Sequence, residues 1–247
     1  MMRIKNLAML VVAAGLLLPL AGIAHEGEAF PHAGNDPYSQ ASLQRGARNF
    51  MNYCSGCHSA KFVRYNRVAK DLGIPDSELR ANLMFTSDKP ADTIQSAMPA
   101  ADAIKWFGVA PPDLSLIARS RGTDHVYAFL MGFYKDPSRP TGVNNTVLAG
   151  TAMPHVLADL QGVQTAIFKS TEAAGAPEFE KFELPVPGTL SPEQYAEFVR
   201  DTVNFLEYMA EPIQTTRRDL GVWVVLFLLI FTGFAYLLYK EFWRDVR

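Results

Sequence analysis

Apolar residues recur at helical spacing in several separate stretches of the chain, and these stretches predict a mostly α-helical fold. We expect helices over residues 39–51, 62–72, 76–85, 124–133 and 191–209, with another after Asp113. Ser39, Asp113 and Ser191 stand where an N-cap belongs, because their side chains can accept from the free N–H groups of a first turn. The 16 prolines and 17 glycines indicate long irregular loops between the helices.

One segment near the C-terminus is apolar enough to cross a membrane. Residues 220–239 contain no charged side chain, and at about 1.5 Å per residue they span roughly 30 Å, the thickness of a bilayer core. Trp223 and Tyr236 near its ends suit the membrane interface. We therefore expect a transmembrane anchor over 216–240 and a cytoplasmic tail over 241–247. A buried core helix is the alternative.

The N-terminal 24 residues have the pattern of an export signal. Arg3 and Lys5 give a basic start, an apolar run follows, and small residues up to Ala24 suit a signal peptidase. An uncleaved first transmembrane helix is the alternative. On either interpretation residues 25–215 form one exported, periplasmic domain. Because the charges that flank the C-terminal anchor are nearly balanced, this export sets the anchor's direction.

Composition narrows the function classes further. A net charge of −2 over 247 residues argues against a nucleic-acid partner. Cys54 and Cys57 are the chain's only two cysteines, so no disulfide remains if both hold a cofactor. Residues 159–190 are acidic and irregular, with a group of glutamates over 172–183. They suit either a docking surface for a basic partner or a solvated loop.

The two cysteines and His58 form the pattern Cys-x-x-Cys-His, the attachment signal of a c-type haem. Two thiols three positions apart, at the start of a helix, can each add to one vinyl group of the same macrocycle. The imidazole of His58 then reaches the iron from the proximal side. The alternatives are a disulfide, a zinc half-site and a thioredoxin-like redox pair. A zinc site needs two more ligands, and the flanking residues lack the βαβ pattern of thioredoxins.

A haem iron held by one histidine has a sixth position, and three residues compete for it. Met98 and Met153 each precede a proline, which stiffens a loop and lets the thioether reach iron at little entropic cost. We favour Met153, because in c-type folds the distal methionine follows the helix that covers the haem, here the one after Asp113. His155 is the third candidate. The expected metal ligands are therefore His58 and Met153.

The segment that begins at Pro111 and Pro112 supplies two further cofactor-binding candidates. The double proline sets a rigid extended approach, and we include Pro112 in the expected haem site. Arg119 lies near the C-terminal end of the following helix, where a cation suits an ionised haem propionate. A solvated arginine favoured by the helix dipole is the alternative for Arg119.

The order of these motifs resembles the cytochrome c1 family, the membrane-anchored haem c subunits of the ubiquinol–cytochrome c oxidoreductase (bc1) complex. The matching residues are Cys-Ser-Gly-Cys-His-Ser at 54–59, Ala-Pro-Pro-Asp-Leu-Ser at 110–115, Arg119, Arg121-Gly122, Ala-Met-Pro at 152–154, Glu211-Pro212 and the single anchor. Family members often carry Asn and Gly just before the second motif. This chain has Trp106 and Phe107 there, which weakens the case for a polar haem contact from those positions.

The resemblance implies one covalent haem c in a mostly α c-type cytochrome domain with long irregular loops, on the periplasmic side of a bacterial inner membrane. It also implies Arg119 as a propionate partner and Met153 as the distal ligand. The subunit would take an electron from the Rieske iron–sulfur protein and pass it to a soluble cytochrome c, beside cytochrome b in a dimeric complex, with no complete active site of its own. The alternatives are a membrane-anchored cytochrome c carrier, a cytochrome subunit of a terminal oxidase and a haem peroxidase-type enzyme.

Overall fold

The computed structural model of the 247-residue chain describes residues 30–169 and 178–246. The chain divides into two compact units, Met1–Phe30 and Pro31–Arg247, and the second unit carries the elements below. The expected export signal over 1–24 lies outside the described residues, as does part of the acidic group over 172–183.

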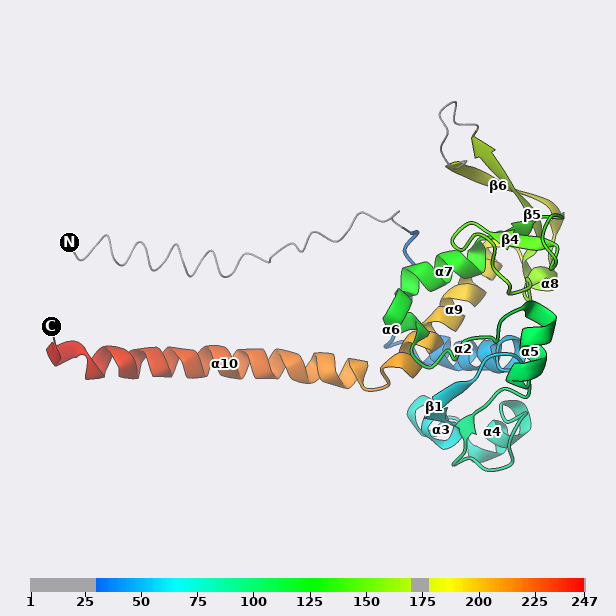
Figure 1. The fold of residues 1–247 in the computed structure, drawn as a ribbon. Coiled ribbons are helices and arrows are strands. Elements are labelled where there is room, and N and C mark those ends of the chain that lie inside the picture. The colour runs from blue at the N-terminus through cyan, green and yellow to red at the C-terminus, as the bar shows by residue number, and fades with distance from the viewer. Residues whose placement is uncertain (1–29, 170–177, 247) are drawn as a thin grey trace. The chain divides into compact units, whose positions relative to one another are not determined.

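Helices dominate the described part of the chain (Figure 1), in agreement with the predicted fold class. In chain order the helices are α2 (Gln40–Tyr53), α3 (Tyr65–Leu72), α4 (Asp76–Asn82), α5 (Ala100–Phe107), α6 (Ile117–Arg121), α7 (Thr123–Met131), α8 (Ala158–Gln161), α9 (Pro192–Ala210) and α10 (Gln214–Phe242), with a 3₁₀ turn η1 (Arg244–Val246).

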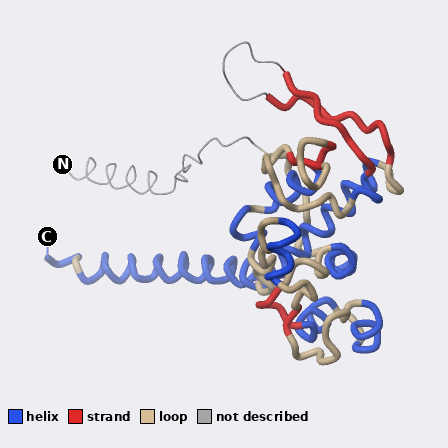
Figure 2. Tube along the Cα trace, turned by 45° about the vertical axis from the view of Figure 1, so that its right-hand side comes forward, coloured by secondary structure: helices blue, strands red, loops and turns tan. Residues whose placement is uncertain are grey.

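Short antiparallel strand pairs connect the helices (Figure 2). The pairs are β1 (Ala60–Arg64) with β2 (Thr93–Ile94), β3 (Phe133–Lys135) with β4 (Val143–Asn145), and β5 (Gly162–Lys169) with β6 (Glu178–Pro187).

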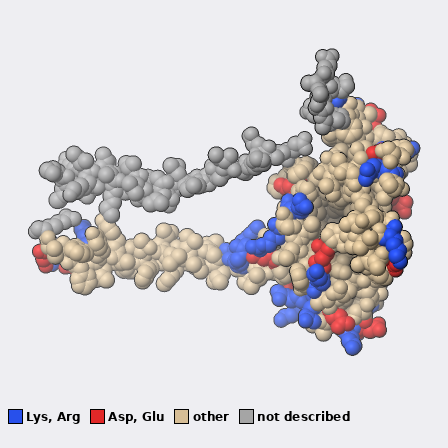
Figure 3. Space-filling view, viewed as in Figure 1, with Lys and Arg blue, Asp and Glu red and all other residues tan. Residues whose placement is uncertain are grey.

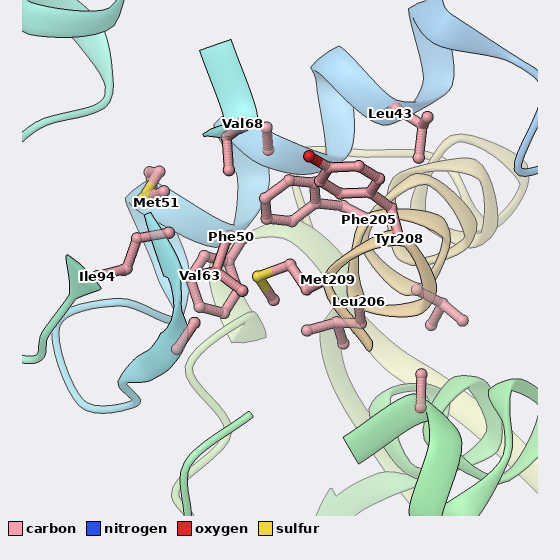
Figure 4. Close-up of a cluster of buried hydrophobic side chains, with 14 of the residues drawn as sticks. Leu43, Phe50, Met51, Val63, Val68, Ile94, Phe205, Leu206, Tyr208 and Met209 are labelled. Atoms are coloured by element: carbon pink, nitrogen blue, oxygen red, sulfur yellow. The ribbon is translucent and has the colours of Figure 1, made fainter. Parts of the chain in front are cut away.

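The core centres on the packing of α2 against α9. Leu43, Ala47 and Phe50 form the buried face of α2 at the spacing the sequence predicts. The Phe50 ring meets the Phe205 ring of α9 with centroids 5.7 Å apart (Figure 4). The helices approach so closely at Gly46 that an added Cβ would lie 2.1 Å from the carbonyl oxygen of Asp201.

A polar cluster fixes the register of the same two helices. The buried carboxylate of Asp201 accepts from Arg45 Nε at 2.5 Å and from Ser42 Oγ at 2.6 Å. Asn204 of α9 also donates to Ser42 Oγ, at 2.9 Å. Because a buried carboxylate is costly without partners, these bonds select one alignment of α2 on α9.

The N-caps of the two long soluble helices confirm the sequence prediction. Ser39 accepts from Ser42 N at the start of α2. Ser191 and Gln194 form a reciprocal capping box at the start of α9, with Pro192 at its first position.

Several predicted boundaries are wrong, and the strand pairs explain all of them except the end of α4. The helix expected over 62–72 begins only at Tyr65, because residues 60–64 form β1 and pair with β2. The helix expected to reach residue 85 ends at Asn82, and Phe133 belongs to β3 instead of the preceding helix. Residues 162–169 and 178–187, expected to be irregular, form the β5–β6 hairpin.

Among the described residues, one helix is long and apolar enough to cross a membrane. It is α10, which contains the predicted apolar run and exposes its large apolar side chains along its length. Only Glu211, Pro212 and Ile213 separate it from α9. The boundaries proposed for the anchor and the tail stay predictions.

Candidate haem site

The Cys-x-x-Cys-His motif forms a tight turn directly after α2. Cys54 is the C-cap of the helix, and its carbonyl accepts from Cys57 N at 3.1 Å and from His58 N at 2.8 Å. The expectation that the motif opens a helix is therefore wrong. After this turn the chain runs into β1, whose pairing with β2 holds it extended.

Both cysteines are free thiols and partly buried. Burial, with a smaller effect from neighbouring Cys57, raises the pKa of Cys54 to about 12, and burial also raises the pKa of Cys57. A thioredoxin-like redox pair requires a thiol whose pKa is lowered, so the environment of these thiols argues against that alternative. Two neighbouring unpaired thiols fit thioether attachment.

The imidazole of His58 is oriented by the double-proline segment. Its Nδ1–H donates to the carbonyl oxygen of Pro112 at 2.7 Å when the ring is neutral. Burial lowers the pKa of His58 more than this bond and the nearby Asp113 raise it, so the neutral form is favoured. With Nδ1 satisfied, the lone pair of Nε2 is left for a metal, which is the usual arrangement of a ligating histidine. Pro112 thus acts through its backbone carbonyl.

Residues around Asp113 attach this segment to the strand that follows the motif. The Asp113 carboxylate accepts from Lys61 N at 2.9 Å and from Ser115 N at 3.0 Å. Buried Ser115 accepts from Phe62 N at 3.1 Å through Oγ. Leu114 N donates to the carbonyl of Ser59 at 2.8 Å. These bonds hold Pro112 in reach of the imidazole.

The predicted capping role of Asp113 is wrong. Helix α6 begins at Ile117, after Leu116, and within the described residues no side chain caps it. Both carboxylate oxygens of Asp113 are already used by the backbone of Lys61 and Ser115.

The two candidate methionines both lie partly buried in loops. Met153 N–H donates to Thr151 Oγ at 3.4 Å, in the loop between β4 and α8. Met98 N–H donates to Ser96 Oγ at 3.0 Å, and Ser96 Oγ in turn donates to the carbonyl of Gly56 inside the motif at 2.7 Å. Ser96, which the sequence analysis missed, ties the Met98 loop to the motif. The choice of Met153 stays a prediction.

His155 packs into the fold as an aromatic ring. It stacks on Phe133 of β3, with centroids 4.9 Å apart and planes 3° from parallel. Burial lowers the pKa of His155 to about 4, against a smaller opposing effect of Gln161, so the ring is neutral at physiological pH. Its Nε2 is buried and unpartnered among the described residues.

Arg119 lies at the junction of α6 and the end of α9. Its Nη1 donates to Glu211 at 3.0 Å, and Arg217 Nε donates to the same carboxylate at 2.6 Å. The side chain of Arg119 is still 65% exposed, so it retains N–H groups for a second anion. Glu211 is a partner that the sequence analysis missed. The propionate contact stays a prediction.

The donor set therefore fits a covalently held haem: two free thiols beside an imidazole whose Nδ1 already has a hydrogen-bond partner.

A profile of the Cytochrome C1 family matches the chain over residues 31–166 and 188–246. The chain belongs to the cytochrome c1 family. The resemblance stated from the sequence is thus confirmed.

Individual relatives support the family assignment. The chain is 51% identical to cytochrome c1 of Allochromatium vinosum over 96% of its own length and 99% of that protein. It is 29% identical to cytochrome c1 of Rhodospirillum rubrum, over 96% and 97% of the two chains. A protein of Nitrosomonas europaea named ammonia monooxygenase gamma subunit is 44% identical over 86% of each chain.

Membership of the cytochrome c1 family establishes the general function. The family implies haem c, and Cys54 and Cys57 are compatible with its covalent attachment. The chain is a haem electron-transfer subunit of a bc1 complex, which implies cytochrome b and a Rieske protein as fellow subunits.

Proposed function

We propose that this chain accepts single electrons from the Rieske protein and passes them to a soluble cytochrome c. The observation that carries the proposal is the bond from His58 Nδ1 to the Pro112 carbonyl, beside the free thiols of Cys54 and Cys57. It leaves Nε2 as a permanent, oriented donor.

The haem, when bound, supplies a reversible one-electron couple, and the protein sets how that couple is used. His58 would hold the iron through Nε2, and Met153 would hold it through its thioether sulfur. A thioether ligand would favour reduced iron and would leave no open site for peroxide. Arg119 stays cationic and offers charge-assisted hydrogen bonds to a propionate. A closed iron site is suited to electron relay and unsuited to a peroxidase reaction.

The anchor and the export signal define the proposed location. Helix α10 crosses the bacterial inner membrane once, residues 25–215 lie in the periplasm, and 241–247 lie in the cytoplasm. The complex is a dimer, as the family resemblance implies. The three-residue connector between α9 and α10 supports a fixed subunit over a tethered carrier, because three residues span at most about 11 Å.

Replacing Met153 tests the distal ligand. In Met153→Ala we expect loss of the near-infrared thioether band of the ferric protein and a lower reduction potential, because a hard or absent ligand stabilises ferrous iron less. Met98→Ala, which removes a thioether from the other Met-Pro loop, is the control and should keep both properties. A band that survives in Met153→Ala but vanishes in Met98→Ala would reverse the assignment.

Co-purification tests the proposed partners. Gentle solubilisation should recover the chain with cytochrome b and the Rieske protein, and the reduced complex should be oxidised by a soluble cytochrome c. The Nitrosomonas relative supplies the competing outcome through its name. Recovery of the chain with oxygenase subunits, and without cytochrome b, would contradict the proposal.

A further inference from the structure

An open groove of about 600 Å³ lies between β1, α3 and the connector that leads into α10. Phe62 and Pro212 contribute apolar surface to it, and Phe62 is 67% exposed. Arg64, Arg67 and Lys70 contribute three cations. An apolar surface under a group of cations is the combination that recognises an amphipathic anion.

The charges of the groove are only partly neutralised. Arg67 makes an ion pair with Asp71, which also accepts from Tyr208 OH at 2.9 Å. Arg64 donates to the backbone carbonyl of Ala91, which offsets no charge. Within the part of the chain that the structure describes, Arg64 and Lys70 form no ion pair, and no acidic side chain lines the groove. The groove therefore has a net positive charge.

The groove also lies close to the anchor along the chain. Pro212, on its wall, comes two residues before α10 begins, and the uncharged run starts at residue 220, about 9 Å along that helix. Headgroups extend several ångströms beyond the bilayer core, and long basic side chains reach toward them. Figure 3 shows Lys and Arg gathered on the first turns of α10 and on the adjoining surface over β1 and α3.

We propose that this groove binds the phosphodiester headgroup of an anionic phospholipid from the outer leaflet, with Arg64 and Lys70 as its main contacts. Arginine pairs with phosphate in a two-pronged geometry and lysine adds a mobile charge. Phe62 and Pro212 meet the glycerol end of the lipid. A zwitterionic headgroup fits less well, because its own cation would be repelled by the cations of the groove. The inference rests on the proposed anchoring by α10.

The experiment measures lipid binding to the full haem-loaded chain in detergent by native mass spectrometry, with phosphatidylglycerol and phosphatidylcholine titrated separately. We expect tighter binding of phosphatidylglycerol, weakened about fivefold by each of Arg64→Gln and Lys70→Gln, since each basic residue near an anionic surface is worth about that factor. Lys89 is exposed, forms no ion pair among the described residues and lies outside the groove, so Lys89→Gln should bind like wild type.

Three results would overturn the inference. The first is equal phosphatidylglycerol binding by the variants and wild type, and the second is equal binding of the two lipids. The third is displacement of phosphatidylglycerol by inorganic phosphate at matching concentration, which would indicate a free-phosphate site.

A separate experiment measures how far the Lys70 amine is protected from acylation in intact membranes. Protection that persists after anionic lipid is removed would assign the groove to a protein partner. Alkaline extraction tests α10 separately: release of the chain from membranes would contradict the anchoring itself.

Discussion

At the scale of single residues, the site depends on backbone atoms as much as on side chains. The imidazole of His58 is oriented by a carbonyl from Pro112, and that carbonyl is held in place by Asp113. The contiguous Cys-x-x-Cys-His motif was predictable because its chemistry is local. Ser96 was missed, and Ser115 was identified only as part of a family motif, because the partners of these side chains at Gly56 and Phe62 are distant in sequence and no local pattern marks the contacts.

Removal of the Asp113 side chain should loosen the double-proline segment. Asp113→Ala leaves the N–H groups of Lys61 and Ser115 without their acceptor, and we expect a loss of about 1–3 kcal/mol in the free energy of unfolding at pH 7. Chemical denaturation measures it. Asp88→Ala, an exposed carboxylate outside this cluster, should change stability by less than about 0.5 kcal/mol.

The difference in stability between wild type and Asp113→Ala should also depend on pH. Burial raises the pKa of Asp113, but hydrogen bonds from Lys61 and Ser115 outweigh it and hold the pKa below the ordinary value of 3.8. A carboxylate whose pKa is lower in the folded protein than in the unfolded chain stabilises the fold at any pH above the unfolded-state pKa. This stabilisation is lost as the pH falls through the pKa of the folded protein. The gap between wild type and Asp113→Ala should therefore narrow below about pH 4. A gap that stays constant down to pH 2 would contradict this account.

At the scale of elements, α2, the helix that leads into the motif, packs mainly against α9. Helical spacing and serine caps predicted both helices well, because each has one apolar stripe and a strong start signal. The β5–β6 hairpin was not predicted, because the glutamates, prolines and glycines of this segment are also typical of an irregular loop. Val163, Thr165 and Ile167 in β5 are β-branched at every second position, which favours a strand.

Because α2 and α9 approach closely at Gly46, adding one methyl group there should have a large effect on the free energy of unfolding. Alanine is a better helix former than glycine by about 1 kcal/mol, yet Gly46→Ala should lower the free energy of unfolding by at least about 2 kcal/mol. The added Cβ would lie 2.1 Å from a backbone oxygen of Asp201, which cannot rotate away. Thermal unfolding of the full chain in detergent is the measurement.

A matched control is Gly221→Ala in α10, where the added Cβ meets no atom within 4 Å. It should leave the unfolding temperature of the haem domain unchanged. Equal effects of the two substitutions would contradict the packing argument.

At the scale of the whole molecule, Glu211 links three parts of the chain: α6 through Arg119, the end of α9, and α10 through Arg217. The helix end at Glu211 and Pro212 was predictable from its resemblance to the family. The ion pairs of Glu211 were not, because its partners come from 92 residues upstream and 6 residues downstream.

The connector should loosen in acid. The hydrogen bond from Arg217, together with the charge of Arg119, lowers the pKa of Glu211 below its ordinary value of 4.5. The Glu211 carboxylate therefore stabilises the connector at any pH above 4.5, and this stabilisation is lost as the pH falls through the pKa of Glu211 in the folded protein. The protection of amides 211–219 against exchange, measured relative to the intrinsic rate at each pH, should fall below about pH 4 in wild type. In Glu211→Gln this protection should already be low at pH 7, whereas Glu197→Gln, on the exposed side of α9, should resemble wild type.

The hydrogen bond between His58 and Pro112 joins residues 54 positions apart, while the two thiols and the imidazole are neighbours in the chain. The proposed thioether attachment at Cys54 and Cys57 therefore needs only a short stretch of extended chain, whereas the direction of the ring needs the proline segment in place. We predict that the two steps are separable: a variant that keeps the proline segment from docking should still bind haem covalently but should remain unfolded.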